Sequence, residues 1–165
     1  MRDEDERVRD DAGSAREALY FEDLPVGRTF ETGAGTVDAA EIKRFAASFD
    51  PQPFHLDEAA AKATFFGGLV ASGWHTAALT MRLMVTSGLP IAGGVIGAGG
   101  EVTWPRPVHP GDTLRAAIEV VAAKRSASRP DRGLVTVRVE TRNRKGEPVQ
   151  IMTARLVVPV RAPAA

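Results

Sequence analysis

Apolar residues recur at helical spacing in the first half of this chain and at alternate positions in the second half. Between residues 38 and 50, four apolar residues have the i, i+3, i+4, i+7 spacing of a helix with one apolar face. They are Ile42, Phe45, Ala46 and Phe49. Asp38 is the expected N-cap of this helix, and Glu41 stands three residues later, where it would complete a capping box. Pro51 is expected to end the helix, because the residue before a proline avoids the α region.

Two further helices are predicted downstream. Asp57 is the expected N-cap of a short helix over residues 58–63. Residues 74–85 then form a longer periodic segment in which Arg82 is the only formally charged side chain. Because a helix that is apolar on nearly every side is usually covered on nearly every side, we expect this one to be buried.

Strand signals dominate from residue 95 onward. Apolar residues alternate over 114–120 and over 135–139, a polar hairpin loop is expected at 125–133, and a last strand at 149–160. The glycine-rich stretch 95–104 predicts a bent or closely packed strand, and 28–32 an edge strand. The predicted fold class is α+β, with an antiparallel sheet around one central helix. We expect one domain over 18–165, preceded by a disordered or frayed charged tail over 1–17.

Composition narrows the function classes. Charged residues make up 25% of the chain and the formal net charge is zero, so neither a nucleic-acid nor an anionic-membrane partner is expected. The absence of cysteine excludes disulfides, thiolate nucleophiles and zinc-thiolate sites. The acidic first residues are unlike a secretory signal, and no apolar run reaches the roughly 20 residues of a membrane helix. We therefore expect a cytoplasmic protein.

The clearest candidates for chemistry are Asp50 and His55, five residues apart on a segment that Pro51 and Pro53 are expected to keep from being helical. A carboxylate and an imidazole that share one water molecule can act as base and as acid. The alternative is that Asp50 is an ordinary turn residue before proline and that His55 is polar surface.

Gly73 stands at the predicted start of the long helix. Its N–H has no partner within the helix and lies at the positive end of the helix dipole, so it could stabilise a developing oxyanion. The alternative is a glycine required by a tight turn. Ser72 is expected to be an N-cap or loop hydroxyl, because it does not lie in G-x-S-x-G. His75 and His109 are expected to be structural, and no metal-ligand spacing is present.

A basic segment covers residues 124–145. It contains eight lysines and arginines against two acids, a net charge of +6 within a neutral protein. It could bind the phosphates of a nucleotide-bearing substrate, or it could be the solvated face of a hairpin.

Two motifs resemble a known family. The sequence F-D-P-Q-P-F-H-L-D at residues 49–57 resembles the hydratase-2 motif of the MaoC-like dehydratases, which include (R)-specific enoyl-CoA hydratases. The sequence R-P-V-H-P-G-D-T-L at 106–114 is similar to the family's R-P-V-x-P-G-D-T-L loop. Three positions depart from the family: Gln52 where asparagine is frequent, Ser72 where histidine is common, and Met81 where some hydratases have serine.

The resemblance implies a hot-dog fold, an antiparallel sheet wrapped around a helix at about residues 74–86. It implies that Asp50 and His55 are the catalytic pair and that Gly73 is the backbone oxyanion donor. Substrate contacts are expected from Gln52, Phe54, Ser72 and Trp74, although the aromatic side chains could instead fill the core. No cofactor and no metal ion are expected.

The implied reaction is reversible hydration of a trans-2-enoyl-CoA, or dehydration of an (R)-3-hydroxyacyl-CoA, in a homodimer or higher homo-oligomer. Two alternatives stay open: an acyl-CoA thioesterase of the same fold, and a non-catalytic module that binds acyl thioesters. Hot-dog thioesterases often rely on a lone carboxylate, so the Asp–His pair favours the hydratase.

Overall fold

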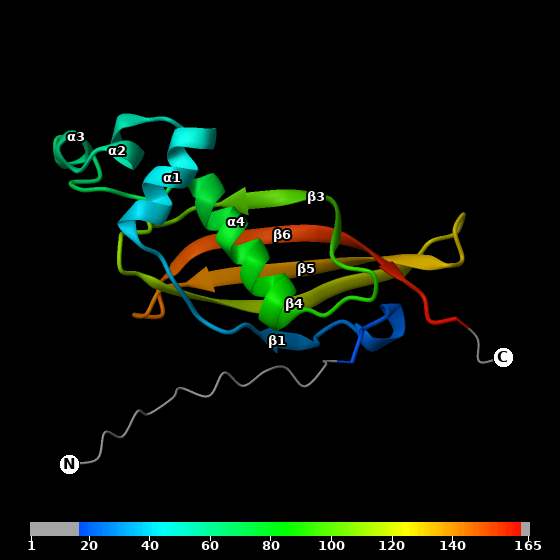
Figure 1. Ribbon diagram of the computed structural model, residues 1–165. Coiled ribbons are helices and arrows are strands. Elements are labelled where there is room, and N and C mark those ends of the chain that lie inside the picture. Colours follow the sequence, from blue (N-terminus) through cyan, green and yellow to red (C-terminus); the bar gives the residue numbers. More distant parts are fainter. Residues whose placement is uncertain (1–16, 163–165) are drawn as a thin grey trace, which may run out of the picture.

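A six-stranded antiparallel sheet and one long helix that crosses it form the frame of the molecule (Figure 1). The computed structural model describes residues 17–162. The main strands are β1 (Thr29–Glu31), β3 (Ile96–Thr103), β4 (Thr113–Arg125), β5 (Arg132–Arg142) and β6 (Pro148–Pro159), arranged in the order β1-β4-β5-β6-β3. The short β2 (Gly35–Thr36) pairs with the start of β4. This is the expected hot-dog arrangement.

The alternating apolar residues face the helix, as their spacing predicts. Every second residue is buried along β5 and along β4 as far as Val120, and Ile118 and Val120 lie opposite Val139 and Val137. Both strands run further than expected, so the hairpin loop between them covers only residues 126–131. The tail predicted over 1–17 lies outside the described residues except for Glu17.

Two of the three predicted helix starts have the expected aspartate caps. The Asp38 carboxylate accepts a hydrogen bond from the Glu41 N–H (2.7 Å) at the start of α1 (Ala39–Phe49). The Asp57 carboxylate accepts one from the Ala60 N–H (2.7 Å) at the start of α3 (Glu58–Lys62). Such caps satisfy amide groups that have no partner inside the helix.

The prediction that the segment after Asp50 is non-helical is wrong in part. Residues Pro53–Leu56 form a single helical turn, α2, with Pro53 at its first position. Proline is tolerated there because the missing N–H would have no partner inside the helix. The turn directs the His55 ring inward, and only 5% of this residue is exposed.

The long helix, α4 (Gly73–Leu83), continues into a π-turn at Met84–Gly88, close to the predicted bounds. The expectation that it is buried on nearly every side is wrong. His75, Thr76, Thr80 and Leu83 are buried, whereas Trp74, Ala78, Met81 and Val85 are exposed. One side of α4 packs on the sheet, where Thr80 and Thr141 share a buried hydrogen bond of 2.8 Å. Within residues 17–162 the opposite side, here called the apolar stripe (Trp74, Ala78, Met81 and Val85), is exposed.

The core has two parts. One lies between the sheet and the π-turn, with Met84, Ile118 and Val137 among its members. The other joins α1 and α3 to α4 and to one end of the sheet, through residues such as Ile42 and Leu114. Burial of each leucine or isoleucine side chain contributes about 1.5–3 kcal/mol to the stability of the folded state. The second part therefore fixes α1–α3 above the start of α4, at the upper left of Figure 1.

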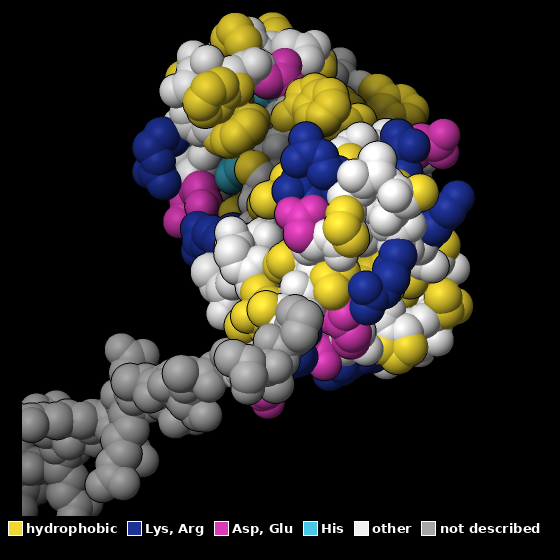
Figure 2. All heavy atoms as spheres, turned by 90° about the vertical axis from the view of Figure 1, so that its right-hand side faces the viewer, with side chains coloured by type: hydrophobic (Ala, Val, Ile, Leu, Met, Phe, Trp, Pro, Cys, Tyr) yellow, Lys and Arg dark blue, Asp and Glu magenta, His cyan; other side chains and the backbone are white. Residues whose placement is uncertain are grey.

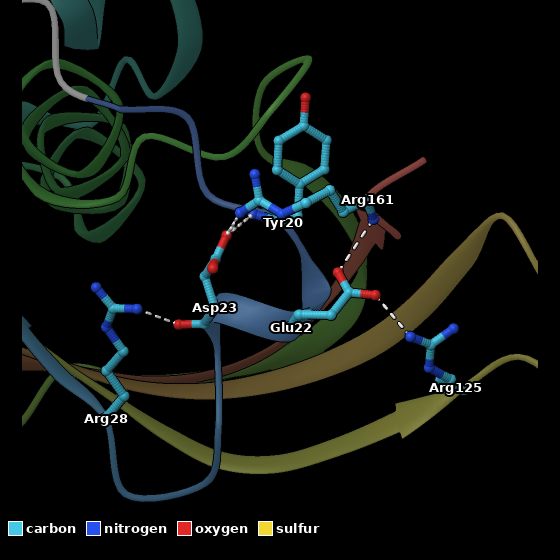
Figure 3. A network of polar contacts seen from close by, with 6 residues as sticks. All are labelled: Tyr20, Glu22, Asp23, Arg28, Arg125 and Arg161. Carbon is cyan, nitrogen blue, oxygen red and sulfur yellow. Dashed lines mark hydrogen bonds and ion pairs between the residues drawn. The ribbon is translucent and has the colours of Figure 1, made fainter. Parts of the chain in front are cut away.

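Polar contacts join the first described residues to the last ones. Glu22 accepts hydrogen bonds from the Arg125 guanidinium (2.6 Å) and from the Arg161 N–H (3.0 Å). Asp23 accepts one from the Arg161 side chain (2.6 Å). We call this group the terminal polar cluster (Figure 3); it consists of Tyr20, Glu22, Asp23, Arg28, Arg125 and Arg161. None of the helices described here is both long enough and apolar enough to cross a membrane.

Candidate active site

Asp50 and His55 lie side by side. Asp50 follows the last turn of α1, and His55 lies on α2, so the chain folds back between them. The Oδ2 atom of Asp50 is 3.3 Å from Nε2 of His55. The two prolines stiffen this reversal, since each fixes its own φ angle.

Two neighbours hold the Asp50 carboxylate. The Ser72 hydroxyl donates to Oδ2 (2.6 Å), and the Gln52 amide donates to Oδ1 (2.7 Å). The hydrogen bond from Ser72 is the main cause that lowers the pKa of Asp50 below its ordinary value, with smaller effects from Gln52 and His55. Asp50 is therefore an ionised hydrogen-bond acceptor at neutral pH.

The orientation of the His55 ring is fixed from behind. Its Nδ1 atom lies 2.7 Å from the carbonyl oxygen of Val70, and the ring of Phe54 packs against it with 4.5 Å between centroids. Because a carbonyl oxygen can only accept, Nδ1 carries a proton in either charge state. In the neutral ring, Nε2 then presents a lone pair on the side of Asp50.

Gly73 begins α4, and within residues 17–162 its N–H donates no hydrogen bond. Ser72 is the N-cap and accepts from the Trp74 N–H (3.2 Å), as expected of a capping hydroxyl. A Cβ on Gly73 would lie 2.7 Å from the indole of Trp104. That indole is held by a hydrogen bond from Nε1 to the side chain of Gln150 (2.9 Å). The close approach explains why this position is a glycine.

A cavity of about 380 Å³ opens beside these groups. All seven residues singled out from the sequence border it, namely Asp50, Gln52, Phe54, His55, Ser72, Gly73 and Trp74. Its wall also includes residues that sequence reasoning did not assign to a site, among them Thr76, Trp104 and Arg106. Arg106 opens the second motif, which could have drawn attention to it, whereas no spacing indicated Trp104.

The other two histidines do not border this cavity. The His75 ring stacks on Phe45 (4.6 Å between centroids, 10° between planes), and burial lowers the pKa of His75. His109 borders a different cavity. In the part of the chain that the structure describes, no three His, Cys, Asp or Glu side chains are grouped so as to hold a metal ion. Met81 lies on the apolar stripe and not among the residues that border the 380 Å³ cavity.

Comparison with known proteins agrees with the two motifs. The family described as "MaoC like domain" matches residues 22–143, which include both motifs and the cavity wall. The chain belongs to the MaoC-like dehydratase family. A solved structure of a MaoC-like dehydratase from Rhodospirillum rubrum is 57% identical to this MaoC-like protein, with a TM-score of 0.86 over 88% of this chain and 99% of the other.

Two curated relatives have named activities. A protein named (R)-specific enoyl-CoA hydratase, from Rhodospirillum rubrum, is 31% identical over 143 residues, 86% of this MaoC-like chain and 93% of its own. A protein named 3-hydroxybutyryl-CoA dehydratase, from Methylorubrum extorquens, is 36% identical over 103 residues, 62% of this chain and 64% of its own.

Proposed function

We propose that this MaoC-like protein catalyses the reversible hydration of a trans-2-enoyl-CoA to an (R)-3-hydroxyacyl-CoA. The hydro-lyase class follows from the family and its two named relatives. One observation favours the assignment of roles: the Asp50 carboxylate and the His55 imidazole meet at 3.3 Å on a cavity that Gly73 also borders.

In the proposed mechanism, one water molecule donates its two hydrogens to Asp50 and to Nε2 of His55. His55 takes a proton as the water oxygen bonds to C3 of the enoyl thioester, and the C2=C3 π electrons move toward the carbonyl oxygen. The Gly73 N–H stabilises that oxyanion at the helix N-terminus. His55 then returns the proton to C2, so that one water has been added.

The low pKa of Asp50 suits this division of labour. A carboxylate that stays ionised is a weak base but a good partner for a transient imidazolium. Its two fixed donors, Ser72 and Gln52, keep it from rotating away. We therefore assign proton transfer to His55 and water orientation to Asp50.

Two other functions remain as outcomes of experiment. A thioesterase of this fold would release free CoA thiol, whereas a hydratase bleaches the absorbance of the enoyl thioester without releasing thiol. A non-catalytic module would bind acyl-CoA without turnover at any chain length. A screen over short, medium and branched enoyl-CoAs that follows both absorbance and thiol separates the three.

The decisive variants are Asp50→Asn and His55→Ala. Each is expected to lower kcat by about a hundredfold or more while the protein stays folded, because each removes one partner of the shared water. Asp131→Asn, at the far hairpin, is the matched control and should keep the wild-type rate. Near-wild-type turnover in either site variant would remove the mechanism.

We also propose that the protein is a homodimer formed through β3 and the apolar stripe. Among residues 17–162, β3 pairs only with β6, and its outer edge has no partner strand. Ile96 on β3 is 55% exposed, and Trp74 and Met81 on α4 are 62% and 40% exposed. Trp104, directly after β3, contacts Trp74 edge-on (5.3 Å), so the two surfaces are continuous. A free strand edge beside exposed apolar side chains favours pairing with a second copy.

A cytoplasmic location stays a prediction.

A further inference from the structure

The basic segment 124–145 is divided by the sheet into two ends. Lys124, Arg125, Arg129 and Arg132 lie at or beside the β4–β5 hairpin, whereas Arg142, Arg144 and Lys145 lie at the β5–β6 turn. Figure 1 places that turn and the 105–112 loop at the end of the sheet where α4 begins, and the β4–β5 hairpin at the opposite end. Only one end of the segment therefore lies near the candidate active site.

Half of the cations in this segment already pair with carboxylates. Carboxylates pair with four of the eight cations at 2.6–2.8 Å, and these are Arg125, Arg132, Arg138 and Arg142. Figure 2 views the hairpin end and shows basic side chains mixed with acidic ones. Among residues 17–162, Arg144 and Lys145 form no ion pair with a carboxylate; Arg144 donates only to the Thr113 hydroxyl (3.3 Å).

Arg144 and Lys145 border a second cavity, of about 490 Å³, between the 106–112 loop and the 143–147 turn. Arg106 and Pro107 belong to the walls of both cavities, so the two adjoin. The Arg106 side chain donates to the carbonyl oxygen of Pro148 (3.3 Å), which anchors it between them.

The acidic groups of the second cavity are already engaged within the protein. The Asp112 carboxylate accepts from the His109 N–H (2.8 Å). The Glu147 carboxylate accepts from the side-chain amide of Asn143 (2.9 Å) and lies 4.0 Å from the Arg106 guanidinium. Three cations thus face two occupied carboxylates, which leaves positive charge for an anionic ligand.

We propose that this second cavity binds the phosphate-bearing nucleotide end of a CoA thioester whose acyl end occupies the first. Arg106, Arg144 and Lys145 would contact the phosphates, and the pantetheine arm would pass Arg106 and Pro107. Several cations around a cavity of this size suit a nucleotide with more than one phosphate. The proposal rests on the proposed function only for the acyl end, since CoA binding is measurable without turnover.

The test compares two double variants that remove equal charge from the same basic segment. Arg144→Gln/Lys145→Gln should raise the Kd for CoA, measured by calorimetry, about tenfold. Lys124→Gln/Arg129→Gln, at the far end, should change it less than about twofold, because salt screens distant charges. Adenosine 3′,5′-bisphosphate should compete with CoA for the wild-type protein. Equal effects of the two double variants, or no competition, would overturn the proposal.

A second measurement guards against a merely structural effect of the site variant. A trans-2-enoyl pantetheine thioester has the same reacting atoms as the CoA substrate but no phosphate. The Arg144→Gln/Lys145→Gln variant should turn it over at the wild-type kcat/KM and lose about tenfold in kcat/KM only with the enoyl-CoA. Equal losses on both thioesters would overturn the assignment. Lys145→Gln alone, which leaves the Arg144–Thr113 contact intact, should show the same selectivity in smaller degree.

The two proposals fail separately. If no enoyl thioester is hydrated, the proposed function fails, while selective loss of CoA affinity would still support the nucleotide site. If hydration is observed and CoA binding is unchanged in the Arg144→Gln/Lys145→Gln variant, the nucleotide site fails alone.

Discussion

Ser72 connects the start of α4 to the Asp50 carboxylate. Its hydroxyl oxygen accepts a hydrogen bond from the Trp74 N–H, and its O–H donates one to the Asp50 carboxylate (2.6 Å). Ser72 is itself 1% exposed, so water cannot readily replace either bond. A single buried hydroxyl therefore fixes the carboxylate relative to the amide of Gly73.

Replacing Ser72 by alanine should raise the pKa of Asp50, because its strongest hydrogen-bond donor is lost. When the Asp50 carboxyl carbon is followed by NMR against pH, its titration should lie at higher pH in Ser72→Ala than in the wild-type protein. Asp38→Ala is the control, since it removes a helix cap but touches neither Asp50 nor the cavity. An Asp50 titration that stays in place in Ser72→Ala would contradict this role.

The same variant has a consequence for stability. A folded-state pKa below the ordinary 3.8 means that ionised Asp50 stabilises the fold above that pH, and that this contribution is lost as the pH falls through the folded value. The loss of stability in Ser72→Ala should therefore shrink in acid toward the pH-independent cost of the missing cap. Urea unfolding at a series of pH values measures it.

The sequence predicted which side chains border the cavity, but not the groups that hold those side chains in place. The residues from Asp50 to His55 are close in sequence, so a local motif could predict that they lie together. The Val70 carbonyl behind His55 and the Trp104 ring against Gly73 come from elsewhere in the chain. Contacts of that kind depend on the packing of whole elements, and no spacing in the sequence indicates them.

Among the elements, the start of α4 is tightly constrained. The indole of Trp104 leaves no room for a side chain on Gly73, and Gln150 holds that indole in place. Gly73→Ala should cost about 1–3 kcal/mol of unfolding free energy, as overpacking in a rigid site does. The expected result is a lower Tm in thermal unfolding.

The cause can be isolated with Trp104→Leu. If the clash with the indole is responsible, Gly73→Ala should cost much less in the Trp104→Leu background, and the two changes will not be additive. Any activity that Gly73→Ala loses should also be restored in part in the Trp104→Leu background, because alanine keeps the backbone N–H. Strict additivity would mean that the glycine is needed for another reason.

Element bounds were predicted more accurately than element environments. Aspartate caps and alternating strands depend on local chemistry, and both were found at the expected places. The single turn of α2 was missed because proline was taken as a helix breaker, although at a first position it is not one. The open side of α4 was missed because composition does not tell whether a second chain covers an apolar surface.

For the whole molecule, that open side leads to a test of assembly. Ile96→Lys on β3 and Met81→Lys on α4 should each shift the protein toward monomer in sedimentation velocity, because a buried lysine has no partner at the proposed interface. Val26→Lys is the matched control: Val26 is 64% exposed, on the turn before β1. A wild-type protein that is monomeric at all concentrations would contradict the dimer.

The terminal polar cluster also affects how the chain could be rearranged. Arg161 contacts Glu22 and Asp23, and its guanidinium lies over the Tyr20 ring at 4.6 Å, so the two ends of the described chain lie against each other (Figure 3). Ends that meet can be linked covalently, and new ones cut at an exposed loop, without separating neighbouring strands. Opened within residues 126–131 and joined at the two ends of the described range, a circularly permuted gene would encode the same sheet in a different order.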